Sequence, residues 1–249
     1  QVTNPPIDPL REHRVMSLKT RFGNLGNVLD QDSSQTNVLT LESPVVTNGM
    51  AERMIARMGD AAYQIDCTFP AGAGADALRE ALARIRDEAE DAVRRGHGHL
   101  ILTDERIDAD SAGIPMVLAA GGVHTHLMQK GLRTFTSINV RSAECLDFAV
   151  LIGVGATTVD AWLAQECIAD RHARGLFGAV SYEECVARYV EAVEQGLLKV
   201  ISKMGISVIS SYRGGYNFEA VGLSRALVAE LFPEMPSRIS GIGLAGIQK

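Results

Sequence analysis

Segments typical of β-strands alternate with segments typical of amphipathic helices along most of this chain, and no other feature restricts its fold as much. Strands are expected at 62–69, 99–104, 134–140 and 206–211, and a short helix that runs into a further strand is expected within 143–156. The main helices are expected at 76–96, 111–131, 160–175 and 181–205, and Asp160 and Ser181 are expected to cap the last two. Such alternation with short connections builds right-handed βαβ units around a parallel sheet. A closed eight-stranded barrel takes about 250 residues, and only five units are visible here. The expected α/β fold is therefore a set of parallel β/α units resembling an incomplete TIM-type barrel.

The first 61 residues do not follow this rhythm. Three prolines stand among the first nine residues, which forces extended or turn backbone. A short strand is expected within 39–46, and an amphipathic helix within 47–60 whose apolar face carries methionines and Ile55. We expect one domain over residues 1–249, made of an irregular Pro-rich N-terminal arm with a helix (1–61) and a β/α-repeat part (62–249).

The charge and the cysteines of the chain argue against several kinds of binding partner and several cellular locations. The formal net charge is −6 and no long basic stretch occurs, so neither nucleic acid nor an anionic membrane surface is an expected partner. The apolar runs are too short to span a bilayer. The four cysteines form no CxxC pair, which favours a reduced, cytoplasmic protein. Because the chain starts at Gln1 without an initiator methionine or a signal peptide, we expect a fragment.

Polar side chains gather where the expected strands end, and in parallel sheets that edge carries function. These strand ends carry Asp66, Asp104, Glu105, Asn139 and Arg141, the turn GVGATT, and finally Tyr212 and Arg213. Two acids, two arginines and a Gly-rich turn are consistent with a site for a small anion. The alternative interpretation is that these residues are helix caps and salt bridges at the starts of loops, which helix N-termini need in any case.

Other motifs carry little chemistry. The turn at 153–156 lacks the third glycine and the following acid of a dinucleotide-binding fingerprint. His97 and His99 lie at the inlet of an expected strand, and His124 and His126 splay apart on an expected helix, so neither pair predicts a zinc site. No nucleophile elbow occurs, and the cysteines are not clustered as iron–sulfur ligands are. The residues alone therefore indicate no specific reaction.

Several blocks, taken together, resemble one known family. In chain order they are QVTNPPIDPLRE, VMSLKTRFGNLGN, LILTDE, GGVHTHLMQKGLRT, LIGVGATTV, LLKVISKMGISVISSYRGGYNFEAVGLS and PSRISGIGL. This order resembles the central domain of the large (alpha) subunit of bacterial glutamate synthase, over nearly the whole chain, and the later blocks resemble the NADPH-dependent form more than the ferredoxin form. The resemblance departs at Asp147–Phe148, where the family carries a few more residues, and this predicts a shortened loop.

The resemblance implies a role without a reactive centre in this segment. Enzymes of the family make two glutamates from glutamine, 2-oxoglutarate and reductant. A glutaminase domain releases ammonia, which travels to a synthase domain that binds FMN and a three-iron iron–sulfur cluster, while NADPH and FAD are used through a small reductase subunit. The central domain lies between the two domains as a scaffold that walls the ammonia path. No cofactor, metal or catalytic residue is expected in this chain, so whether it is an enzyme by itself stays open.

Two hypotheses follow for the polar strand ends. In the first, the chain is a scaffold, and Arg213, beside Tyr212 at the carboxyl ends of the strands, grips a neighbouring carboxylate such as Asp104 or contacts a flanking domain. The following glycines let the backbone leave the strand sharply. In the second, a degenerate flavin-type barrel binds a small anion or metabolite through Arg141 and Arg213 as an allosteric site.

Overall fold

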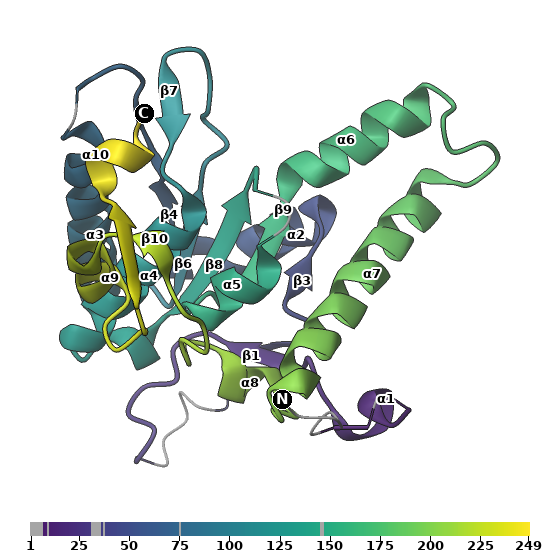
Figure 1. Ribbon diagram of the computed structural model, residues 1–249. Coiled ribbons are helices and arrows are strands. Elements are labelled where there is room, and N and C mark those ends of the chain that lie inside the picture. The colour runs from purple at the N-terminus through teal and green to yellow at the C-terminus, as the bar shows by residue number, and fades with distance from the viewer. Residues whose placement is uncertain (1–6, 9, 31–35, 37, 75, 145–146) are drawn as a thin grey trace.

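A five-stranded parallel sheet forms the centre of the protein, as the alternation predicted (Figure 1). The computed structural model describes residues 7–8, 10–30, 36, 38–74, 76–144 and 147–249. The strands stand in the order β3-β9-β8-β6-β4, with the bounds β3 Val45–Val46, β4 Ala62–Asp66, β6 His99–Thr103, β8 Ser137–Ser142 and β9 Thr158–Ala161. All neighbouring pairs are parallel. Four strands follow in chain order and the sheet stays open, which is consistent with a partial β/α barrel.

Three helices pack against the outer face of this sheet through apolar side chains. They are α3 (Ala77–Arg94), α4 (Met116–Gln129) and α5 (Phe148–Gly153). On α3 the stripe includes Leu78, Leu82 and Ile85, which are fully buried in the same core as Leu100 and Leu102 of β6. Burying a side chain of this size contributes about 1.5–3 kcal/mol, so this layer supplies much of the stability.

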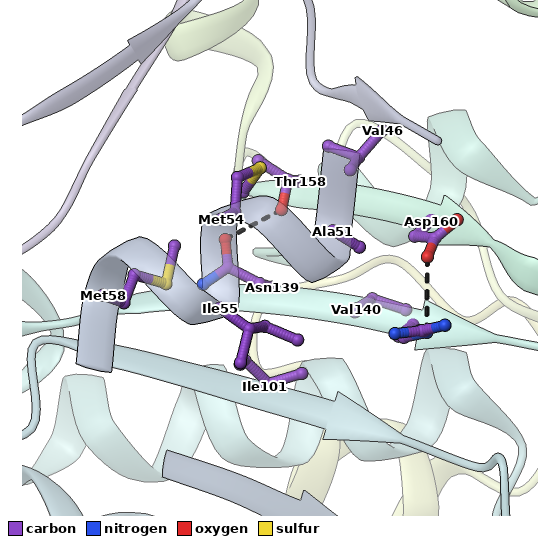
Figure 2. A pocket seen from close by; sticks show the side chains of 11 residues that line it. Val46, Ala51, Met54, Ile55, Met58, Ile101, Asn139, Val140, Thr158 and Asp160 are labelled. Carbon is purple, nitrogen blue, oxygen red and sulfur yellow. Dashed lines mark hydrogen bonds and ion pairs between the residues drawn. The ribbon is translucent and has the colours of Figure 1, made fainter. Parts of the chain in front are cut away.

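The inner face of the sheet is covered by a helix from the N-terminal arm. This helix, α2 (Asn48–Met58), was expected from its methionine pattern and begins where the Thr47 side chain accepts a hydrogen bond from the Met50 N–H. It lies across the strands, and Met54 and Ile55 point toward them (Figure 2). Since β3 belongs to the same arm and pairs with β9, the arm completes the sheet and is less irregular than its prolines suggested.

Helices α6 (Trp162–Ala173) and α7 (Tyr182–Lys203) extend together away from the sheet (Figure 1). Ser181 caps α7 by accepting a hydrogen bond from Glu184 N–H, as its spacing predicted. The remaining elements are short: α1 Glu12–Val15, β1 Thr20–Phe22, β2 Leu39–Leu41, η2 Gly59–Ala61, β5 Thr68–Pro70, β7 Ser111–Gly113, η3 Arg133–Phe135, α8 Ile209–Tyr212, β10 Val221–Leu223, α9 Arg225–Leu231, β11 Ile239–Ile242 and α10 Leu244–Ile247.

The expected fifth strand at 206–211 is wrong. Only Ser17 and Val208 form an isolated parallel bridge, and the chain then enters the short helix α8. Ile209 and Tyr212, three residues apart, are both fully buried, which is the spacing of a helix face and not of a strand. A short apolar run does not distinguish the two structures by itself.

Two further boundaries differ from expectation for related reasons. The short helix and the strand expected within 143–156 occur in that order but further along the chain, as α5 (Phe148–Gly153) and β9 (Thr158–Ala161), so Asp160 lies in a strand and does not cap α6. Ser111 pairs with Pro70 in a two-stranded ribbon, and α4 starts after Pro115 instead. The shortened loop predicted at Asp147–Phe148 stays a prediction; both residues are described, and Phe148 is the first residue of α5, whereas the preceding residues 145–146 lie outside the described residues.

Candidate functional sites at the two ends of the sheet

Asp104 follows β6 at the carboxyl edge of the sheet and fastens three elements there. Its buried carboxylate accepts hydrogen bonds from Ser142 Oγ at 2.7 Å, from Trp162 Nε1 at 2.8 Å and from the Ala143 N–H at 2.9 Å. Hydrogen bonds to an ionised group are stronger than hydrogen bonds between neutral groups. Asp104 therefore joins the ends of β6 and β8 to the first residue of α6, and its acceptor capacity is used inside the protein.

Arg141 lies at the same edge in an ion-pair network. Its Nε lies 3.4 Å from Asp160 Oδ2, and its Nη2 lies 3.1 Å from Glu105 Oε1. Gln165 Nε2 donates to Asp160 Oδ1 at 2.9 Å. Burial raises the pKa of Asp160 to about 7, because desolvation outweighs the attraction of Arg141. Arg141 is thus already paired with two carboxylates.

Asp160 is the residue that the sequence interpretation missed at this edge. The signal was the alternation in β9: Thr158 and Asp160 face the same side as Asn139 and Arg141 of the neighbouring strand, and Thr158 Oγ1 donates to Asn139 Oδ1 at 2.8 Å (Figure 2). Reading Asp160 as a helix cap removed it from that set. With β9 placed correctly, period-2 alternation pairs the two charges.

The space between α2 and the inner face of the sheet is nearly filled. A cavity of about 20 Å³ remains, lined by apolar side chains of α2 and by Asn139, Arg141, Thr158 and Asp160 of the strands (Figure 2). That volume holds about one water molecule. The inner face of the sheet is therefore covered by the protein's own helix α2.

Tyr212 and Arg213 lie at the opposite, amino-terminal edge of the sheet, where α8 and β1 are found (Figure 1). The prediction of a position at the carboxyl ends of the strands, within reach of Asp104, is wrong because the expected strand is absent. Tyr212 is fully buried, and its hydroxyl donates to the Ala149 carbonyl at 2.9 Å. Burial raises the pKa of Tyr212 to about 12, so this hydroxyl stays protonated.

Arg213 is partly buried and held by the N-terminal arm. Its Nη2 donates to Thr20 Oγ1 of β1 at 2.8 Å, while its Nε is buried and has no hydrogen-bond partner among the described residues. Burial lowers the pKa of Arg213 to about 10, which leaves the side chain charged at neutral pH. Gly214 has the positive φ expected of it (67°), and Tyr216 shares this conformation, whereas Gly215 does not.

A second buried arginine lies beside this corner. Arg133 donates through Nε to His124 Nδ1 at 2.9 Å and through its Nη atoms to the carbonyls of Thr136 and Gly155. Burial first, and the nearby Arg133 second, lower the pKa of His124 to about 3, so the imidazole is neutral and accepts at Nδ1. A Cβ on Gly155 would lie 2.3 Å from the His124 ring, so the glycine turn packs on a side chain.

The predicted residues therefore do not form a single site. Asp104 and Arg141 lie at one edge, Tyr212 and Arg213 at the other, and the two arginines do not converge on one anion. His99 starts β6 as expected and its Nδ1 lies 3.0 Å from Ser137 Oγ. Within the described ranges, no group of three or more His, Cys, Asp or Glu residues is arranged to hold a metal ion. None of the helices described here is both long and apolar enough to cross a membrane.

Comparisons with known proteins agree with one another. The profile of the family "Glutamate synthase central domain" matches residues 1–224. The chain is 67% identical to the "Glutamate synthase [NADPH] large chain" of Azospirillum brasilense, over 100% of this chain and 17% of that protein. It is 38% identical to the "Ferredoxin-dependent glutamate synthase, chloroplastic" of Spinacia oleracea (98% and 16%) and 37% identical to the NADPH large chain of Bacillus subtilis (99% and 16%).

The chain thus spans about a sixth of the length of these curated relatives. The family profile covers most of the chain, and it covers both edges of the sheet, including Asp104, Asp160 and Arg213. The protein therefore belongs to the glutamate synthase central domain family.

Proposed function

We propose that this chain is the central scaffold domain of a longer glutamate synthase chain. In this role it holds a glutaminase domain and an FMN-binding synthase domain at a fixed separation and forms part of the wall along the path of ammonia between them. The observation that carries the proposal is the match to the family profile over residues 1–224, together with 67% identity to a glutamate synthase large chain.

The packing of α2 favours a scaffold role and argues against a flavin-binding barrel in this chain. The inner face of the sheet retains about 20 Å³, far less than the hundreds of cubic ångströms that cofactor sites occupy. The carboxyl edge is likewise occupied by the hydrogen bonds of Asp104 and the ion pairs of Arg141. We place FMN and the iron–sulfur cluster in the adjoining synthase domain for this reason.

The electron donor and the location belong to the same proposal. The identity to the Azospirillum protein supports an NADPH-dependent enzyme that receives electrons through a small reductase subunit carrying FAD, in the cytoplasm. This inference rests on that relative, because the Bacillus NADPH protein is no more similar to the chain than the spinach ferredoxin-dependent one. An anion site shared by Arg141 and Arg213 has no support, since the arginines lie at opposite edges.

The scaffold role is tested by measuring how tightly glutamine hydrolysis is coupled to glutamate formation. The full-length chain that contains this segment is prepared with Asp104→Ala, which removes hydrogen bonds that join β6, β8 and α6. We expect free ammonium released per glutamine hydrolysed to rise severalfold while glutamate formation falls, because a loosened wall leaks ammonia. Ammonium and glutamate are measured in the same reaction.

Asp108→Ala is the matched control, because Asp108 accepts only a local hydrogen bond from the Asp110 N–H and is exposed. It should leave the ammonium-to-glutamate ratio unchanged. The proposal is contradicted if Asp104→Ala also leaves that ratio unchanged although the variant is measurably less stable. It is also contradicted if the purified 249-residue segment shows a flavin absorption spectrum or hydrolyses glutamine.

A further inference from the structure

A groove at the amino-terminal edge of the sheet is lined mainly by cations, hydroxyls and aliphatic side chains. Its volume is about 500 Å³, and it lies between β1, the side chains of Leu25, Val28 and Val38, and the start of α8. The side chains that matter here are Lys19, Arg21, Arg213, Ser210, Val28 and Val208. Three positive charges in one groove are notable on a chain whose formal net charge is −6.

Little negative charge faces these cations from the described residues. Glu42 is the carboxylate that contacts Lys19, at 3.0 Å from Nζ, and its own side chain is largely in solvent. Asp30, two residues after Val28, accepts a hydrogen bond from the Asn27 side-chain amide at 2.8 Å. Arg21 makes no side-chain hydrogen bond or ion pair with any described residue. With respect to the described residues, the groove therefore retains uncompensated positive charge.

Arg213 presents its charge from a fixed position. Its backbone N–H donates to the Ile209 carbonyl, the next N–H donates to the Ile152 carbonyl, and Nη2 is held by Thr20. Its buried Nε still has no partner among the described residues. Because the side chain is already ordered, an acceptor that reaches it is bound without a further large entropic cost. A carboxylate matches the planar fork of a guanidinium.

The aliphatic part of the groove indicates what carries that carboxylate. Val28 and Val208 are exposed by 59% and 39%, and Leu29 beside them is more exposed still. A small free anion leaves such apolar surface in water, whereas a peptide segment covers it and gains hydrophobic contact. Since the relatives are about six times as long as this chain, a longer chain offers many such segments.

We propose that this groove is the docking site for an acidic segment with apolar neighbours from another part of the same, longer chain. The acidic side chains meet Lys19, Arg21 and Arg213, and the apolar ones cover Val28 and Val208. The inference rests on the proposed function, because it requires flanking domains in the same polypeptide. Charge complementarity of this kind sets the register of an interface and suppresses wrong partners.

Zero-length cross-linking with a water-soluble carbodiimide identifies the occupant, because it joins an amine to a carboxylate only where the two are in contact. In the full-length chain we expect peptide mapping to find Lys19 coupled to an Asp or Glu outside these 249 residues. Coupling to Glu42 is the internal reference, since that pair is already 3.0 Å apart. Lys19→Arg keeps the charge and should abolish both products.

The proposal is overturned if Lys19 couples only to carboxylates within these residues, or to a separate subunit. A second measurement does not depend on one lysine. Arg21→Glu should speed hydrogen exchange in β1 (Thr20–Phe22) severalfold in the full-length chain, whereas Arg57→Glu, an equal charge reversal at an exposed position of α2, should not. Equal exchange in the two variants contradicts the docking site.

The two proposals fail separately. A cross-link from Lys19 to a distant carboxylate, with no change in ammonium release for Asp104→Ala, leaves the docking site in place and removes the scaffold role in ammonia transfer. Cross-links confined to this segment, with strong ammonium release for Asp104→Ala, do the reverse.

Discussion

At the scale of single residues, the buried charged side chains have different kinds of partner at the two edges of the sheet. Asp160 and Arg141 form an ion pair with further partners on each side, and Asp104 is surrounded by donors. Arg133 instead reaches carbonyls and a neutral imidazole, and Arg213 a hydroxyl. Buried atoms without a hydrogen bond occur at both edges, Arg141 Nε and Asp160 Oδ2 at the first and Arg213 Nε at the second. The difference is that Arg141 lies beside two carboxylates, whereas no carboxylate among the described residues contacts Arg213.

Asp160 gives the stability of the protein a predictable dependence on pH. Its folded pKa of about 7 lies above the ordinary 3.8, so the folded state binds the extra proton between these values. Stability from this group is therefore complete below about pH 4 and falls as the pH rises through about 7, by on the order of 2–4 kcal/mol in total. Asp160→Asn cannot ionise, so the variant should gain stability relative to the wild type between pH 5 and pH 8 in urea unfolding.

The same substitution at exposed Asp108 controls for the lost carboxylate as such. Asp108→Asn should follow the wild-type pH dependence within error. Parallel curves for Asp160→Asn and the wild type between pH 5 and pH 8 would show that Arg141 holds Asp160 ionised in the folded protein, against this prediction.

At the scale of elements, close contact between helices depends on where glycine stands. On α4, Gly121 lies against Phe232 just beyond α9, and an added Cβ would come within 2.1 Å of the ring. On α7, Gly196 has no atom within 4 Å of the corresponding position. Both glycines are within helices, so their intrinsic cost to the helix is the same and only their surroundings differ.

Replacement by alanine is predicted to change the stability of the protein in opposite directions at these two glycines. Gly121→Ala should destabilise the protein by about 1–3 kcal/mol, because the buried Phe232 ring must move in a packed core. Gly196→Ala should stabilise it by about 0.5–1 kcal/mol, since alanine favours the helix and meets no neighbour. Urea unfolding of both variants checks this. A stabilising Gly121→Ala would mean that α4 and α9 are not packed as described.

At the scale of the whole molecule, the two-stranded ribbon formed by β10 and β11 leaves apolar surface uncovered. Strands β10 and β11 pair in parallel, and Val221, Ile239 and Ile242 on them are each more than half exposed. Monomeric proteins rarely leave contiguous apolar surface in water. Within a longer chain, a neighbouring domain is expected to cover such surface, and in the isolated segment a second copy is the available cover.

The isolated 249-residue segment should therefore self-associate reversibly. Sedimentation velocity between low and high micromolar concentration is expected to show a rising average mass. The double variant Ile239→Lys and Ile242→Lys should remain monomeric, because it places charge on the exposed ribbon. The double variant Ala173→Lys and Ala187→Lys, at exposed positions of α6 and α7, adds the same charge elsewhere and is the control. Unchanged association of the Ile239 and Ile242 variant would contradict this role of the ribbon.

The order of strands and helices followed from sequence because it depends on local periodicity. The stripe of α3, the apolar run of β6 and the Ser181 cap of α7 are each decided by residues within a few positions of one another, and each was predicted correctly. Where the local pattern was ambiguous, at 206–211, a strand was predicted in place of a helix. Within 143–156, the boundary between helix and strand was misplaced. The family also followed from sequence, since its blocks run the length of the chain.

Only the tertiary structure decided which distant elements and residues contact one another. The chain by itself determined a parallel β/α fold and a family, but not that α2 closes the inner face, that β3 completes the sheet, or that Asp160 pairs with Arg141. Nor did it place Arg213 at the amino-terminal edge, 193 positions along the chain from its Thr20 partner. Periodicity reports the neighbours of a residue along the chain, whereas these contacts join distant segments, and their choice depends on how the whole core packs.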